Sequence, residues 1–254
     1  MADTFTAGYK IAVIIPAFNE EHNVREVLNK LRMWRQTDFH NRPIIVVNDG
    51  STDATKASAK TQWSEVIDSQ GSKKNAGKGT AFIAGVRHAV EKYKPDIILM
   101  LDADLVALNH ENIDYMIKKL IGSKNDMVVA KSFEPNMREL DWRYSGQRAI
   151  RTAALRPLLN GNKRWITMLS HGYGLETALN QLIKKTQVLS KPLFAALDAH
   201  RKNSLERQHE EILFITEVAD QRNRLVDIRK EQLKKAREAR RQVNALPKKP
   251  LGFH

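Results

Sequence analysis

The chain has 254 residues, of which 42% are hydrophobic, and it contains no cysteine. This length suffices for one α/β domain with a smaller appendage, and the lack of cysteine excludes disulfides, thiolate metal sites and cysteine nucleophiles. It also favours a reducing compartment. The formal net charge of +13 predicts attraction to anions in general, whether small ligands, anionic lipid or nucleic acid.

Two further classes of protein are disfavoured by hydropathy. Residues 1–8 are short and polar, which argues against a secretory signal peptide. No apolar run approaches the roughly 18 residues that are needed to span a bilayer. We therefore expect a cytoplasmic protein.

The first predicted elements are a strand, a loop and a helix. Residues 11–15 are all apolar and precede Pro16, which is typical of a buried strand that ends there. Asn19 fits a helix N-cap, with Glu20 and Glu21 in the first turn. Apolar residues spaced three and four apart then predict a helix over 24–34.

The same pattern repeats twice along the chain. A second buried strand over 43–47 leads into Asp49 and a glycine-containing turn, and a third over 97–101 leads into Asp102. A helix is predicted over 81–90. Strands alternating with helices indicate a parallel sheet, whose ligands bind beyond the carboxyl ends of the strands. We therefore expect Glu20, Asp49 and Asp102 to gather at one edge.

Asp102-Ala103-Asp104 forms a D-x-D pattern at the end of the third strand. Residues two apart on a strand point the same way, so both carboxylates are expected to reach one divalent cation. Mg²⁺ and Mn²⁺ prefer oxygen ligands and commonly bind one or two carboxylates together with substrate phosphates. The alternative interpretation is a solvated acidic turn.

Four segments resemble those of the family 2 glycosyltransferases, which have the GT-A fold: residues 13–20, 46–53, 75–79 and 101–104. Residues 145–149 and 172–176 resemble the branch that transfers mannose or glucose to polyprenyl (dolichol) phosphate. The resemblance implies a Rossmann-like, mostly parallel central sheet flanked by helices. It also implies metal-dependent inverting transfer from a UDP- or GDP-linked sugar to polyprenyl phosphate at a membrane face.

The resemblance also implies roles for particular residues. Asp102 and Asp104 would bind the metal, and Asp104 would thereby support catalysis. The base of the nucleotide would donate hydrogen bonds to the carboxylate of Asp49. The residues implied in binding the nucleotide sugar are Pro16, Ala17, Phe18, Glu20, Asp49, Lys78, Asp102 and Ala103. Residues 71–80 superficially resemble a phosphate-binding P-loop, but the required glycine and the Ser or Thr after Lys78 are missing.

The acceptor side leaves two alternatives open. For a phosphate acceptor we expect Arg148 to bind the phosphate oxygens, because the planar guanidinium group presents paired N–H donors that match their spacing. A sugar hydroxyl, as in cell-envelope or capsule polysaccharide synthesis, would instead need a carboxylate base, for which Asp141 and Glu176 are candidates. Asp141 stands one residue further from the Ser-Gly pair than is usual in the branch. His171 and His200 are further candidates.

We divide the chain into a GT-A domain over 1–203, a basic amphipathic helical extension over 204–246 and a disordered tail over 247–254. The nucleotide-sugar half covers about 8–110 and the acceptor half about 111–203. The extension is expected either to pack on the domain or to lie on anionic lipid at the inner face of the membrane. The basic stretches lack interleaved aromatic residues, so no nucleic-acid partner is expected. A non-catalytic nucleotide-binding relative that serves as an interaction module is the alternative from another class.

Overall fold

The computed structural model describes residues 8–35, 42–69, 75–105, 108–133, 141–161, 165, 168–169 and 174–195. The predicted extension over 204–246, the predicted tail over 247–254, and His171 and His200 lie outside these residues.

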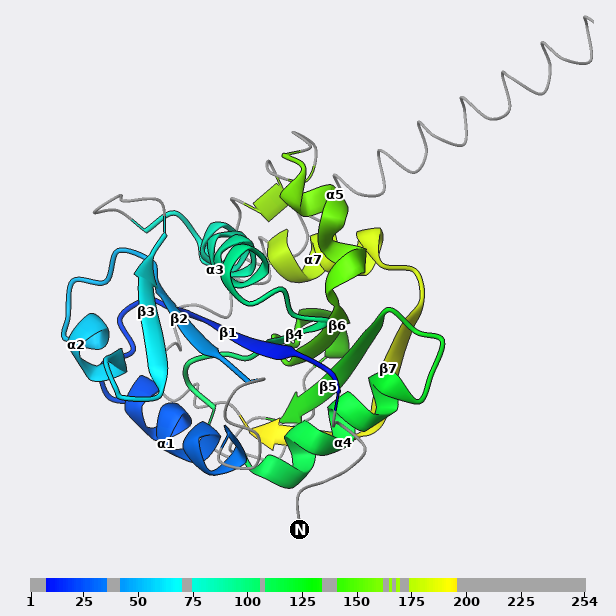
Figure 1. The fold of residues 1–254 in the computed structure, drawn as a ribbon, viewed down its shortest axis with the longest axis horizontal. Helices are drawn as coiled ribbons and strands as arrows, with labels where there is room; N and C mark the ends of the chain where they lie inside the picture. Colours follow the sequence, from blue (N-terminus) through cyan, green and yellow to red (C-terminus); the bar gives the residue numbers. More distant parts are fainter. Residues whose placement is uncertain are drawn as a thin grey trace, which may run out of the picture. The chain divides into compact units, whose positions relative to one another are not determined.

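A seven-stranded sheet forms the centre of the described part of the chain (Figure 1). The strands are β1 (Ile11–Ala17), β2 (Ile44–Asn48), β3 (Ser64–Asp68), β4 (Ile97–Met100), β5 (Met127–Phe133), β6 (Arg148–Arg151) and β7 (Thr186–Ala195). Their order is β3-β2-β1-β4-β6-β5-β7. β6 runs antiparallel to β4 and β5, and the remaining pairs are parallel. The predicted mostly parallel sheet is therefore confirmed.

Helices cover both faces of this sheet. They are α1 (Val24–Arg35), α2 (Thr55–Ala59), α3 (Lys78–Lys92), α4 (His110–Ile121), α5 (Arg156–Leu159) and α7 (Gly174–Leu182), with 3-10 turns η1 (Trp142–Tyr144) and η2 (Thr152–Leu155). Figure 1 shows α1 and α4 on one face and α3, α5 and α7 on the other. Among the described helices, none is both long and apolar enough to cross a bilayer.

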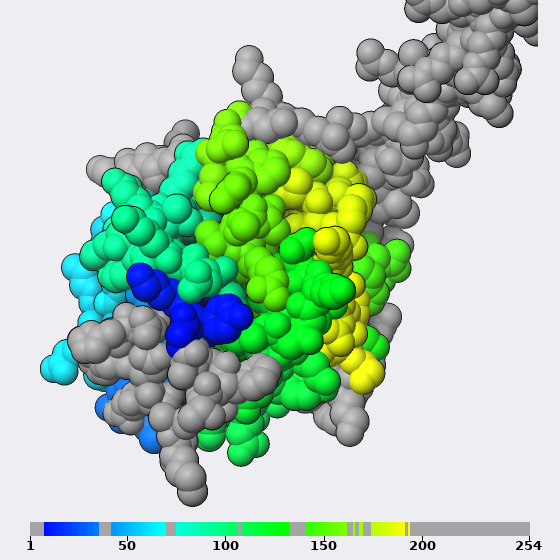
Figure 2. Space-filling model, turned by 45° about the vertical axis from the view of Figure 1, so that its right-hand side comes forward, coloured from blue at the N-terminus to red at the C-terminus, as the bar shows by residue number. Residues whose placement is uncertain are grey.

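The two faces of the sheet have separate hydrophobic cores, because successive strand residues point to opposite sides. In β1, Val13 and Ile15 pack with the residues of α1 and α4, whereas Ile14 packs with Phe82 of α3. All seven residues of β1 are buried, as expected for a strand at the centre of a parallel sheet. Just before β1, the carbonyl oxygen of Lys10 accepts a hydrogen bond from the Asp96 N–H at 2.8 Å. Figure 2 shows the N-terminal part of the described chain, in dark blue, at the surface.

Several predicted boundaries were wrong, β2 and β4 by a single residue. β1 continues through Pro16, because the missing N–H of that residue faces the side on which β4 has already ended. α3 begins at Lys78, before the predicted start at residue 81. α1 begins at Val24, and Asn19 is not its N-cap: its φ of 56° is left-handed, and its side chain bonds to a different loop.

Candidate functional site

The loops that follow β1 and β2 are bound to each other. The Asn19 N–H donates to Ser51 Oγ at 3.1 Å, and Asn19 Oδ1 accepts from the Thr52 N–H at 2.9 Å. The Glu20 N–H donates to Thr55 Oγ1 at 2.7 Å. These bonds hold the backbone of Glu20 at the edge where the parallel strands end.

We expect Asn19→Ala to destabilise the fold more than Asn19→Gly does. Both changes remove the hydrogen bond from Thr52. Glycine adopts the left-handed backbone conformation without a steric penalty, whereas for alanine this conformation costs about 1–2 kcal/mol. Denaturant unfolding of the two variants measures the difference. Equal stabilities would show that the backbone conformation at Asn19 contributes nothing.

Asp49 fixes the start of α3. Its carboxylate is buried and accepts from Ser69 Oγ, from the Ala76 N–H at 3.1 Å and from the Gly77 N–H at 2.8 Å. Gly77 has a φ of 91°, which favours glycine, and Lys78 follows as the first helical residue. Asp49 thus positions Lys78, while its predicted contact with a nucleotide base stays a prediction.

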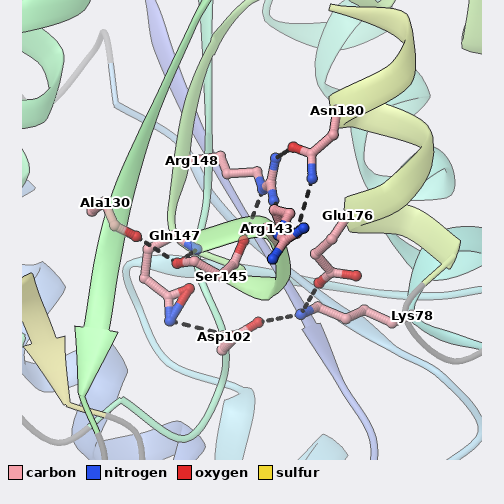
Figure 3. Close-up of polar contacts among 9 residues, drawn as sticks. All are labelled: Lys78, Asp102, Ala130, Arg143, Ser145, Gln147, Arg148, Glu176 and Asn180. Atoms are coloured by element: carbon pink, nitrogen blue, oxygen red, sulfur yellow. Dashed lines mark hydrogen bonds and ion pairs between the residues drawn. The ribbon is translucent and has the colours of Figure 1, made fainter. Parts of the chain in front are cut away.

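Lys78 forms ion pairs with two carboxylates that lie far apart in the sequence (Figure 3). Its Nζ lies 2.6 Å from Asp102 Oδ1 and 2.7 Å from Glu176 Oε1. Burial opposes the charge on Lys78, but the two carboxylates outweigh burial and raise the pKa of the ammonium above its ordinary value. The side chain of Glu176 is only 1% exposed, so Lys78 is its neutralising partner in the protein interior.

The residues that precede β6 shape the other side of Asp102. Gln147, itself buried, donates from Nε2 to Asp102 Oδ2 at 3.1 Å. A Cβ atom at Gly146 would stand 2.2 Å from Asp102 Oδ1, so the carboxylate lies directly against the glycine. Ser145 Oγ anchors this segment by donating to the Ala130 carbonyl at 2.6 Å. The position of the Asp102 carboxylate is therefore fixed from both sides.

Asp104 lies among negative charges. Burial, together with the charges of Asp102 and Glu20, raises the pKa of its carboxyl group to about 7, although Lys78 opposes the shift. β4 ends at Met100, so the two acids of the D-x-D pattern lie in the turn beyond the strand rather than on it. The charge of Glu20 acts on Asp104, so the loop after β1 and the turn after β4 lie near each other at this edge of the sheet.

This arrangement fits a divalent cation that is bound partly by its substrate. Within the described residues, no group of three or more acidic or histidine side chains converges as a metal site. Among the described residues, Asp102 and Asp104 are therefore the candidate ligands, and phosphate oxygens and water would supply others, as is common for Mg²⁺. A cation placed here would also relieve the repulsion that raises the pKa of Asp104.

The other residues predicted to bind the nucleotide sugar lie at the same edge. Pro16 and Ala17 end β1 and are buried, and Phe18 follows them with partial exposure. Ala103, in the turn between the two acids, is 4% exposed. Their contacts with a nucleotide stay predictions.

Arg148 does not occupy the place that was predicted for it. Its guanidinium is fully buried and donates to the carbonyls of Ser145 at 2.8 Å and Arg143 at 3.0 Å, and to Asn180 Oδ1 at 2.7 Å. Burial lowers its pKa to about 10, against the opposing effect of Glu176. The prediction that Arg148 binds the phosphate of an acceptor is therefore wrong for this structure, in which the residue joins β6, η1 and α7 (Figure 3).

Asp141 is likewise engaged by the protein. It caps η1 by accepting from the Arg143 N–H at 3.0 Å, and it forms an ion pair with the guanidinium of the same residue. The hydrogen bonds from Arg143 lower the pKa of the Asp141 carboxyl group, which makes it a poor general base. The geometry gives Asp141 a structural role instead of the predicted catalytic one.

Two contacts at the site were missed by the sequence interpretation. Gln147 stands at a position where the resemblance tolerates any residue, so no signal marked it. Lys78 and Glu176 are 98 residues apart, so no local pattern predicts that they meet. Covariation between the two positions is the kind of signal that identifies such a pair.

Comparison with known proteins gives a family match and several relatives. The model described as glycosyl transferase family 2 matches residues 12–174. A dolichyl-phosphate beta-glucosyltransferase of Trichomonas vaginalis is 30% identical over 178 residues, which cover 66% of this chain and 50% of that protein. A prophage bactoprenol glucosyl transferase homolog of Escherichia coli (strain K12) is 32% identical over 124 residues, which cover 48% of this chain and 39% of that protein. The chain thus spans half or less of the length of these relatives.

Solved structures with the same fold come from Mycobacterium tuberculosis. Glucosyl-3-phosphoglycerate synthase has a TM-score of 0.59 at 21% identity, covering 81% of this chain and 77% of that chain. Its complex with Mn²⁺ and UDP-glucose has a TM-score of 0.57 at 19% identity, covering 80% and 76%. This likeness confirms the predicted GT-A fold. Because the family model matches well over half of its residues, the chain belongs to glycosyl transferase family 2.

Proposed function

We propose that this protein is a metal-dependent inverting glycosyltransferase that moves a sugar from a nucleoside diphosphate sugar to polyprenyl phosphate. The observation that carries the proposal is the ion pair of Asp102 with Lys78 at 2.6 Å in the turn after β4, where Asp104 lies near enough to Asp102 and Glu20 for their charges to raise its pKa. Two supports come from similar proteins. The relatives are named for transfer to dolichyl phosphate or bactoprenol, and a protein of the same fold binds Mn²⁺ with UDP-glucose.

The residues have distinct tasks in this reaction. Transfer leaves negative charge on the departing diphosphate, and a divalent cation held by Asp102 and Asp104 would supply the compensating positive charge. The ammonium of Lys78, which pairs with Asp102 in this structure, is a second positive charge in the site. Glu20 and Asp49, in the loops after β1 and β2, are the groups we assign to the nucleoside. The inverting outcome is inferred from family membership alone.

The state of the candidate bases favours a phosphate acceptor. A sugar hydroxyl must lose its proton to a base, but Asp141 is paired with Arg143 and Glu176 with Lys78. A phosphate monoester is already anionic near neutral pH and needs no base. The net charge of +13 is suited to an anionic lipid surface, and we propose that transfer takes place at the cytoplasmic face of a membrane.

Transfer assays test the donor and the acceptor together. We expect a radiolabelled sugar to pass from UDP-glucose or a GDP-linked sugar into the organic phase only when both Mn²⁺ or Mg²⁺ and polyprenyl phosphate are present. Chelation of the metal should abolish the product, because the diphosphate would leave without charge compensation.

Three other outcomes would contradict the proposal. Transfer to a glycan hydroxyl without the lipid would favour polysaccharide synthesis. Undiminished transfer after chelation would contradict the proposed dependence on a metal ion. Tight nucleotide binding with no transfer to any acceptor would favour a non-catalytic interaction module.

A further inference from the structure

Lys78 forms an ion pair with Asp102, the carboxylate to which the proposed function assigns a metal ion. Its ammonium lies 2.6 Å from Asp102 Oδ1, and within the described part of the chain no uncharged group donates a hydrogen bond to that oxygen. A divalent cation and an ammonium cannot share this contact without strong repulsion between them. The other oxygen, Oδ2, accepts a hydrogen bond from Gln147 at 3.1 Å. Binding of the metal to Oδ1 of Asp102 therefore requires Lys78 to move off that oxygen.

Lys78 cannot withdraw into solvent at low cost, because Glu176 would then be left behind. The carboxylate of Glu176 is 1% exposed, and its Oε2 atom has no hydrogen-bond partner among the described residues. Removing one partner of a buried ion pair leaves an uncompensated charge, which is strongly unfavourable. Arg148 attracts Glu176 electrostatically, but its guanidinium donates to other groups.

We propose that Lys78 is an internal cation that competes with the metal ion for Asp102, and that Glu176 is the positioning residue that retains Lys78 when the metal displaces it. The inference rests on the proposed function. The exchange keeps Glu176 paired in both states: Lys78 shares its single positive charge between Asp102 and Glu176 before the metal binds, and pairs with Glu176 alone afterwards. The retained ammonium then stands beside the metal, where the diphosphate of the donor brings its own negative charge.

A double-mutant cycle on metal affinity tests the competition. Mn²⁺ binding to the full chain is measured by electron paramagnetic resonance, with and without UDP, for the wild type, Lys78→Gln, Asp102→Asn and the double variant. We expect Lys78→Gln to tighten Mn²⁺ binding about tenfold in the wild-type background and to have no effect in Asp102→Asn. An equal effect in both backgrounds would overturn the inference, because it would reflect only the loss of a nearby positive charge.

The role of Glu176 is tested by Glu176→Gln. Without Glu176 as a second partner, Lys78 should pair more strongly with Asp102, so the Mn²⁺ affinity of this variant should fall several-fold. The affinity should recover in Lys78→Gln/Glu176→Gln, which lacks the competing ammonium. A purely structural role for Glu176 would leave Mn²⁺ affinity unchanged in the single variant. The Lys78→Gln/Glu176→Gln protein also contains no unpaired buried carboxylate at position 176, and it therefore replaces Lys78→Gln in the cycle if the single variant does not fold.

The wild-type protein provides an independent measurement. Titration with Mg²⁺ should shift the NMR signal of the Lys78 side chain in ¹⁵N-lysine-labelled protein, assigned with Lys78→Gln, and an unchanged signal at saturation would overturn the inference. Failure of the proposed function looks different, since no Mn²⁺ would then bind to any variant even with UDP present. Tight Mn²⁺ binding without coupling between Lys78 and Asp102 would leave the proposed function intact and reject only the competition.

Discussion

Replacing Asp104 by asparagine is expected to abolish metal-dependent transfer while it stabilises the folded protein. Loss of a metal ligand should lower the rate about a hundredfold or more, because charge stabilisation by a metal contributes several kcal/mol. The stability gain arises because the ionised carboxylate of Asp104 is disfavoured by burial and by Asp102 and Glu20. Its removal should increase stability by about 1 kcal/mol, which raises Tm by roughly 2–4 °C.

The stability gain from Asp104→Asn should depend on pH in a defined direction. The pKa of Asp104 is raised to about 7 in the folded protein from its ordinary value of 3.8. Below the lower value the carboxyl group is protonated in both states and contributes no penalty. As pH rises, the unfolded chain releases its proton first, so the penalty grows up to about pH 7 and is constant above it. The difference in Tm between Asp104→Asn and the wild type should follow the same course.

Thermal unfolding over this pH range, together with transfer rates, checks the prediction. Glu111→Gln is the matched control, because it removes an exposed acid from the first turn of α4. An acid at that place is favourable, so the control should lose a little stability and keep full transfer activity. An Asp104→Asn protein that retains transfer, or whose Tm is lowered at neutral pH, would show that Asp104 is not the repelled metal ligand described here.

Gly146→Ala is expected to cost about a hundredfold in transfer, although it adds a single methyl group. The new Cβ would stand 2.2 Å and 2.3 Å from the two oxygens of Asp102, far inside contact distance. The carboxylate would have to turn away, which breaks its contacts with Lys78 and Gln147. Displacement of a binding group by about 1 Å can reduce the rate about a hundredfold. The Mn²⁺ affinity of the variant should fall in parallel.

Gly85→Ala separates a loss of site geometry from a loss of stability. Its added Cβ would meet Ile14 and Val47 at 2.6 Å and 2.7 Å, in the core beneath α3 and away from Asp102. This control should lower Tm through overpacking but should retain most of the transfer rate per folded molecule. If Gly146→Ala keeps its rate while losing stability as Gly85→Ala does, Gly146 serves packing alone and does not shape the site.

In the nucleotide-binding half, β1, β2, β4, α1 and α3 could be predicted because their signals are local, whereas β3 was missed. An unbroken run of apolar residues indicates a buried strand, and apolar residues spaced three and four apart indicate one face of a helix. Neither signal depends on which other elements pack against the segment. The acids after β1, β2 and β4 could be placed together because parallel strands bring their carboxyl ends to one edge. Asn19 failed as a predicted cap because the loop after β2 offered its side chain another partner.

The roles of the charged residues depended instead on contacts between distant segments. From the sequence, Arg148 was as suited to a phosphate as to a set of backbone carbonyls, and only the packing of η1 and α7 around it made it structural. Asp102 was recognisable as an acid beyond a strand, but its partners Lys78, Gln147 and Glu176 come from three other parts of the chain. Local patterns thus specified which chemical groups stand at the edge of the sheet. The folded arrangement selected which of them neutralise one another and which are left for a ligand, because Coulomb energies and burial vary with distances that no short stretch of sequence encodes.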